Sequence, residues 1–389
     1  MKRALLPLAL IAMGFAGSAA ASGFNDWPVS AKFGDVKFSL TGQYNYDFND
    51  PHNAQGVLDK SQTNRRKEFG FKVADKGKWD GIVYFDFQSK KWLDVYWRVD
   101  TKWLFGHDFG KVRFGYSKTP VGFEANTSSR TTSFMELALP ETVYEGRRTG
   151  VDWALERPQY LINVGYYFGQ DLQGDNDGTT VAARAAWTPF KASGEVLHLG
   201  LSGSIEHPQA TTDGRDIRHD PGKSWASKPE MGLTTTDLIS SGSLSHVDSN
   251  RRMGFEGLWI HGPLSLQGEY LQAHTKRNDG LPSYTADGYY AFGSYVLTGE
   301  SRPYSGGNVG NIKPTHPWGA VELLLRYSAL DLNDGPVLGG RQHDVTLGAN
   351  WYLTQHFKLQ ADYVKVHADR KNGQHLDPNI VELRASVFF

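Results

Sequence analysis

The sequence alternates between apolar and polar residues in many short stretches, and this pattern limits the folds open to it. In an early stretch, Val36, Phe38 and Leu40 alternate with polar residues. The final stretch alternates from Val381 to Phe389 and ends on an aromatic residue. Because successive side chains of a β-strand point to opposite faces, these stretches predict strands with one apolar and one polar face.

Counting such stretches along the sequence predicts an all-β fold of about sixteen strands, an even number as expected for a bacterial transmembrane barrel. Both termini then lie on the same side of the membrane, and the longer loops fall on the opposite side. The predicted strands cover residues 36–46, 66–73, 83–87, 93–99, 112–116, 149–153, 160–166, 181–189, 196–205, 252–260, 264–273, 284–297, 321–327, 345–351, 357–363 and 381–389.

The composition supports a barrel in the outer membrane over a helical membrane protein. Charged residues make up 21% and aromatic residues 13% of the 389 residues. After the N-terminus, no stretch reaches the roughly 18 apolar residues of a spanning helix. A spanning strand of a barrel shows only alternate residues to lipid, so a polar sequence suffices. A large soluble β protein is the alternative, but the final strand resembles the terminal strand of outer-membrane barrels.

The N-terminus predicts export. Lys2 and Arg3 precede an apolar stretch from Leu5 to Phe15, and Ala19–Ala21 supplies the small residues of a cleavage site. We therefore expect a signal peptide over 1–21, a short periplasmic segment over 22–35, and a barrel domain over 36–389. The sequence contains no cysteine, which excludes disulfides, zinc–thiolate sites and cysteine nucleophiles.

The stretch Gly110–Arg148 interrupts the strand pattern. Alternation stops at Thr119–Pro120 and resumes at Thr149. Loops of this length in a compact chain are usually functional or disordered, and this one has too many apolar residues for disorder. It also carries Lys118, Arg130, Arg147 and Arg148. We expect a packed basic loop that folds into the barrel lumen and narrows it.

Two other connections are long. Residues 207–250 are rich in Gly, Ser, Thr and Asp and show no alternation, so we interpret them as one surface loop. Residues 298–317 are rich in Gly and Pro and fall on the side of the short turns. The pattern gives no reason for the length of this second connection.

Several of these stretches resemble the phosphate-selective porin O and P family. The resemblance rests on RFGYSKTPVGFE at 113–124, TSSRTTSFMELALP at 127–140 and GRRTGV at 146–151, in that order. Further matching stretches are Arg65–Arg66, Leu93–Tyr96, Gly262–Tyr270, Arg302–Gly307 and Gly319–Leu332. The resemblance implies a trimeric sixteen-stranded barrel in the outer membrane of a Gram-negative bacterium, with an inward third loop and a central basic site for phosphate or polyphosphate.

By this resemblance, Arg65, Arg66, Lys118 and Arg130 fall on basic positions of the central site, and Asp94 matches an acidic residue opposite them. Strict alternation from Phe69 puts Arg65 on the lipid face, so an inward role for Arg65 requires a bulge. An arginine ladder along the vestibule has candidate members in Arg184, Arg215, Arg218, Arg251, Arg252 and Arg277.

Basic residues around a narrow lumen select anions, and arginine adds a fork of donors for phosphate oxygens. We therefore expect passive diffusion of small anions, with Lys118 and Arg130 at the constriction. In the competing interpretation, Arg130 only pins the loop through Asp94 or Glu136. Lys67–Glu68 stand where phosphate-selecting members place small or aromatic residues, so a general porin or one for other small acids stays open.

An outer-membrane hydrolase barrel is the enzymatic alternative, because Ser, His and Asp are all present. The sequence has no GxSxG nucleophile motif, and the 13 His residues show no HxH or HExxH spacing. We expect a porin that is not an enzyme, uses no cofactor or metal, binds no nucleic acid and contacts outer-membrane lipid. An adhesive or structural barrel would have no use for an inward basic loop.

Overall fold

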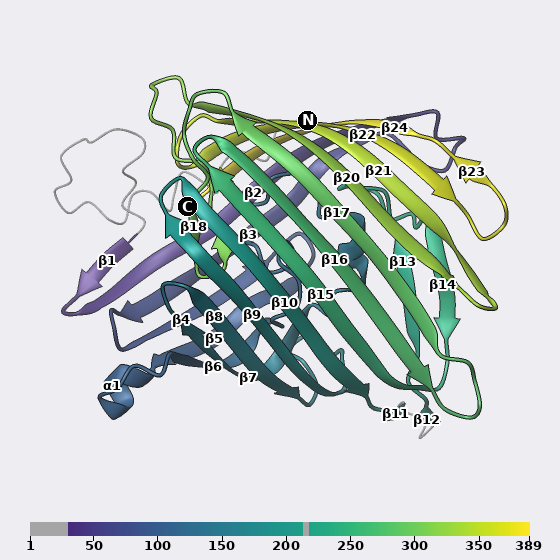
Figure 1. The fold of residues 1–389 in the computed structure, drawn as a ribbon, viewed down its shortest axis with the longest axis horizontal. Helices are drawn as coiled ribbons and strands as arrows, with labels where there is room; N and C mark the ends of the chain where they lie inside the picture. Colours follow the sequence, from purple (N-terminus) through teal and green to yellow (C-terminus); the bar gives the residue numbers. More distant parts are fainter. Residues whose placement is uncertain (1–29, 213–217) are drawn as a thin grey trace, which may run out of the picture.

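The structure is a computed structural model that describes residues 30–212 and 218–389; the predicted signal peptide, 1–21, lies outside these ranges. Sixteen antiparallel strands close into one barrel (Figure 1). Each strand pairs with the next along the chain, and the last, β24, pairs with the first, β2. The predicted all-β barrel is confirmed.

The barrel strands are β2 Val36–His52, β3 Ser61–Asp75, β4 Trp79–Asp86, β5 Lys91–Asp100, β6 Lys111–Lys118, β7 Arg147–Glu156, β8 Tyr160–Phe168, β9 Gly178–Ala192, β10 Glu195–Pro208, β15 Val247–His261, β16 Leu264–Arg277, β17 Tyr284–Val296, β20 Ala320–Asp334, β21 Val337–Tyr352, β22 Phe357–Asp369 and β24 Asn379–Phe388. The others are β1 Ser30–Phe33, β11 Thr211–Thr212, β12 Arg218–His219, β13 Lys223–Ser227, β14 Ile239–Leu244, β18 Tyr304–Ser305, β19 Asn308–Val309 and β23 His375–Leu376, with helix α1 Thr101–Phe105 and the 3-10 helix η1 Leu139–Val143.

The strand alternation separates the two faces of the barrel wall. Leu325 and Leu347 are exposed on the outside, whereas their neighbours Arg326 and Thr346 are buried inside. Apolar side chains therefore face lipid and polar side chains face the lumen, as the pattern predicted. No helix among the described residues is long and apolar enough to span a membrane.

One strand departs from strict alternation. In β3, Arg66 pairs with Asn45 and Asn64 pairs with Tyr46, so Arg65 is an extra residue without a partner across the ladder. Such a bulge changes which face the following side chains occupy. The Arg65 side chain accordingly turns inward and meets Glu136 of the loop after β6.

The connection between β6 and β7, residues 119–146, folds into the lumen as predicted, and we name it the inward loop. Its main chain bonds to the opposite wall, where Met135 N donates to Asp362 and Leu139 N donates to Ser328. Phe134 packs there in a cluster with Tyr290, Phe292 and Leu324. The inward loop therefore lies closer to the late strands and leaves space beside the early ones.

The expectation of a surface loop over 207–250 is wrong. Strands β10 and β15 themselves cover its two ends, and between them β13 and β14 form a hairpin with buried apolar side chains (Figure 1). Trp225, Leu238 and Ile239 belong to the largest buried cluster of the described residues. Because these residues are few and scattered among Ser, Gly and Thr, no sequence period marked them.

The connection over 298–317 also enters the barrel, from the end that carries the short turns. Arg302 forms a buried ion pair with Glu322 of β20. Val309 packs against Val196 and Leu258, and Phe123 of the inward loop joins the same cluster. This contact explains the length that the sequence left without a reason, since the connection reaches from the rim to the inward loop.

Candidate functional site

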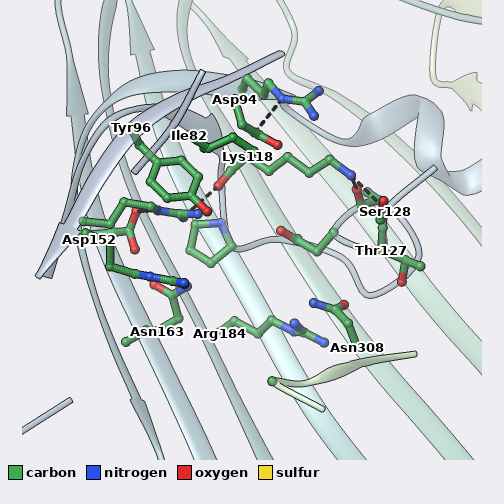
Figure 2. Close-up of a pocket in the computed structure, with 18 of the residues that line it drawn as sticks. Ile82, Asp94, Tyr96, Lys118, Thr127, Ser128, Asp152, Asn163, Arg184 and Asn308 are labelled. Atoms are coloured by element: carbon green, nitrogen blue, oxygen red, sulfur yellow. Dashed lines mark hydrogen bonds and ion pairs between the residues drawn. The ribbon is translucent and has the colours of Figure 1, made fainter. Parts of the chain in front are cut away.

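The lumen contains a cavity of about 830 Å³ between the inward loop and the wall formed by the early strands (Figure 2). Eleven basic and seven acidic side chains line it, an excess of four positive charges, whereas the whole chain has a formal net charge of −1. The cavity wall is therefore more basic than the protein as a whole. Arg66, Asp94, Lys118 and Arg130 line this cavity, whereas Arg65 does not line it but bonds to Glu136, which does.

Lys118 joins the wall to the inward loop. Its ammonium donates to the main-chain oxygens of Ala125, at 2.5 Å, and Thr127, at 2.7 Å. Figure 2 shows the Lys118 side chain extended toward Thr127. Lys118 thus holds the first turn of the loop in place and at the same time brings a basic group to the cavity.

Arg130 sits on the inward loop itself. Its Nη1 donates to the main-chain oxygen of Phe389 at 3.0 Å, and its guanidinium lies 5.4 Å from the centre of the Tyr84 ring. The competing interpretation paired Arg130 with Asp94 or Glu136. Those two carboxylates bind other arginines instead, so neither of them pairs with Arg130.

Asp94 pairs with Arg147, at 2.9 Å, on the strand that leaves the inward loop. Two similar pairs lie on the same wall: Arg98 with Asp80 at 2.9 Å, and Arg113 with Asp152 at 2.7 Å. In each pair an acidic group occupies only part of the donor fork. The wall therefore presents several guanidinium groups that are held in position and still have hydrogens to donate.

Sequence reasoning missed Lys72, Arg98 and Arg113 as lining residues, although all three border the cavity, as does Arg147 of the predicted basic loop. The signal was available in the alternation. Arg98 is an even number of residues from Asp94 and Tyr96, so it lies on the same face of its strand as they do. Arg113 lies between Val112 and Phe114, so it points to the face opposite these two apolar residues. Parity alone assigns such residues to the lumen, but it does not tell which part of the lumen stays open.

Arg66 has a carboxylate close by. Its Nη1 donates to Glu68 at 3.1 Å, and Glu68 also accepts from the Tyr84 hydroxyl at 2.8 Å. Glu68 is one of the two residues, with Lys67, at which the sequence departs from the family pattern, and here it occupies part of the Arg66 donor fork. The positive charge of Arg66 is thereby partly balanced before any ion enters the cavity.

Of the ladder candidates whose side chains the structure describes, only Arg184 borders the cavity, where it pairs with Glu256. Arg252 is buried against Glu206. Arg277 bonds to Ser245 near the loop ends, and Arg251 is exposed. Arg215 and the side chain of Arg218 lie outside the described residues.

Glu136 is the main tether of the inward loop. Its carboxylate accepts from Arg65, at 3.0 and 2.9 Å, and from Arg384 of β24, at 2.8 Å. Burial raises the pKa of Glu136, but the charges of Arg65 and Arg384 outweigh burial and hold the pKa below its usual range. The tether therefore keeps its charge at neutral pH and is lost only in acid, as the pH falls through that lowered pKa.

The closed barrel, the inward loop and the charged lumen together define an outer-membrane porin. The chain belongs to the phosphate-selective porin O and P family, which it matches over residues 38–389. The protein accordingly resides in the outer membrane of a Gram-negative bacterium.

Two curated relatives extend this result. Porin O of Pseudomonas aeruginosa is 30% identical over 233 residues, which cover 50% of this chain and 50% of that protein. This chain therefore aligns with only half the length of that relative. An uncharacterized protein of Caulobacter vibrioides is 24% identical over 358 residues, 87% of this chain and 70% of that protein.

Solved structures share the fold at low identity. OmpT, an outer membrane protein of Vibrio cholerae, has a TM-score of 0.59 at 15% identity and covers 92% of this chain and 99% of its own. An anion-selective porin from Comamonas acidovorans has a TM-score of 0.55 at 12% identity, with 91% and 100% covered. These similarities support the barrel fold alone.

The tether can be tested with Glu136→Gln. The change leaves Arg65 and Arg384 without their shared carboxylate, and breaking a buried pair costs about 3–5 kcal/mol. We expect the inward loop to loosen, so that single-channel conductance and open-channel noise both rise in planar bilayers.

The control is Glu156→Gln, which removes another carboxylate of the cavity, one that pairs with Lys191 and not with the loop. An equal rise in both variants would show that lost charge, not loop release, changes the current.

Proposed function

We propose that this protein is a passive pore for small anions, with phosphate or oligophosphate as the leading candidates. The observation that carries the proposal is the positive excess along the cavity wall, together with the position of the cavity beside the inward loop. Local fixed charges select ions, so a slightly negative chain is no objection. A basic lumen lowers the free energy of an anion relative to a cation at the same point.

The arginine–carboxylate pairs suit transport better than tight capture. A guanidinium has five N–H groups, and the carboxylate partner of Arg98, Arg113 or Arg147 uses only part of them. The remaining donors replace part of the hydration shell of a passing oxyanion. The nearby carboxylate repels that same anion, which keeps binding weak enough for release.

Phosphate is favoured over other small acids because its oxygens match the planar donor fork of arginine. Glu68 weakens this preference for phosphate, because its carboxylate carries a negative charge into the cavity. The Oε1 atom of Glu68 lies 3.1 Å from Nη1 of Arg66. A pore for other small acids, or a general porin, is the competing function. A hydrolase barrel has less support, because the curated relative is named a porin and the cavity wall is dominated by ion pairs.

Two measurements on the purified protein in planar bilayers test this function. In a potassium chloride gradient, the reversal potential should move toward the chloride equilibrium potential. Added phosphate should then reduce the chloride current. A reversal potential near that of potassium would overturn the anion pore, and chloride selectivity without phosphate block would leave the general small-anion pore.

The roles of Lys118 and Arg130 can be separated by substitution. Arg130→Ala removes a charge-assisted hydrogen bond from the guanidinium to a phosphate oxygen, worth about 1.5–3 kcal/mol. The concentration of phosphate needed for block should therefore rise by roughly tenfold or more. Arg130→Lys should keep anion selectivity but lose part of the phosphate block, since lysine lacks the fork. Lys118→Ala should weaken block and also raise conductance, because it frees the loop carbonyls of Ala125 and Thr127.

Arg341→Gln is the matched control, because Arg341 is exposed, pairs with Asp331 and does not line the cavity. The binding site idea fails if phosphate block is unchanged in both the Lys118→Ala and Arg130→Ala channels.

We further propose that three copies assemble into a trimer. A Vibrio cholerae OmpT structure with the same fold is described as a trimer form, with a TM-score of 0.55. Phe87, in the turn after β4, and Trp92, at the start of β5, present aromatic side chains outward at the end of the wall opposite α1, which suits contact with another barrel wall. Chemical cross-linking in mild detergent should trap a three-chain species; a product that stays monomeric at every dose argues against assembly.

A further inference from the structure

Helix α1 and the turn around it, residues 100–110, form a rigid protrusion at the barrel rim, which we name the knob. The Asp100 side chain accepts from Lys102 N at 2.9 Å, and Gly106, with φ 75°, ends the helix. The Thr101 hydroxyl donates to Gly110 O at 2.7 Å and accepts from Phe109 N at 2.8 Å. These bonds fix the direction in which the side chains of the turn project.

Four large apolar side chains of this knob point away from the protein. Trp103 is 51% exposed, Leu104 50%, Phe105 66% and Phe109 57%. A rigid cluster of such side chains in water is unfavourable, since each exposes apolar surface without gain. Contiguous exposed apolar surface marks a site of contact with lipid or another molecule.

The knob continues the outer surface of the barrel wall. It joins β5 to β6 at the end where short turns such as Lys76–Lys78 lie, the periplasmic end in barrels of this type. Figure 1 shows α1 projecting sideways beyond that end of the wall. Trp153 of β7 donates from its indole N–H to Phe109 O at 2.6 Å, and the neighbouring Trp97 and Phe114 face outward.

We propose that α1 and Phe109 form an anchor that inserts into the headgroup region of the periplasmic lipid leaflet. Tryptophan and other aromatic residues favour this boundary between water and hydrocarbon. The charges of the turn balance, with Lys102 and Lys111 against Asp100 and Asp108, so no net charge opposes the approach to phospholipid headgroups.

A second copy of the chain is the other conceivable occupant. Stable protein interfaces bury about 800 Å² on each partner, and one turn with four outward side chains offers only a small contact. The continuity with the outward aromatic residues of the wall favours lipid. The anchor does not depend on which ion the pore carries.

The absence of cysteine allows a clean test. Leu104→Cys introduces a single thiol for a nitroxide spin label on the full-length protein, reconstituted in vesicles of phosphatidylethanolamine and phosphatidylglycerol. Collision rates with oxygen, which concentrates in lipid, and with a water-soluble nickel chelate then report where the label lies. We expect high oxygen access and low nickel access at position 104.

Lys76→Cys, on an exposed turn at the same end, is the control and should be open to nickel. Phe105→Cys repeats the test if the first variant fails to fold. Access to nickel at position 104 would overturn the anchor. Shielding from both oxygen and nickel would overturn it in favour of contact with a second chain. Unchanged ion currents in Trp103→Ser would show that the anchor and the pore are separate functions.

Discussion

The structure depends on the closure of the sheet, in which β24 pairs with β2 and leaves no free edge. In hydrocarbon every backbone N–H and C=O needs a partner, so an open sheet could not cross the membrane. Closure also divides each strand into a lipid face and a lumen face. Because polar side chains such as Arg326 and Thr346 are unfavourable in lipid, they point into the lumen, and the interior becomes an enclosed polar volume.

Charged contacts then decide which part of that volume stays open. Arg384, Asp47, Arg65 and Glu136 form one connected group that draws the inward loop to the seam between β24, β2 and β3. The hairpin of β13 and β14 and the connection over 298–317 occupy more of the lumen. The remaining cavity runs along the early strands, where arginines paired with carboxylates supply an excess of positive charge.

Local patterns predicted the barrel and most lumen-facing positions, because alternation is a property of neighbouring residues. They also predicted the inward loop, whose apolar residues exceeded what a surface loop needs. Only one conflict indicated the bulge at Arg65. Strand alternation placed the residue on the lipid face, whereas the family resemblance implied a side chain in the lumen. The burial of Trp225 and the reach of Val309 were not predictable, since both depend on walls contributed by distant strands. Which arginines border open space likewise depends on the segments that occupy the rest of the lumen, and the sequence of a single strand does not reveal it.

The tether at Glu136 also sets an order of events during assembly. Its two arginines come from β3 and from β24, the final strand of the barrel, and Arg130 binds the main chain of Phe389 beyond β24. The inward loop therefore has its full set of contacts only after the last strand has paired with the first. Before that moment the loop lacks its bonds to Arg384 and to the main chain of Phe389. The final position of the loop in the lumen is thus coupled to completion of the barrel wall.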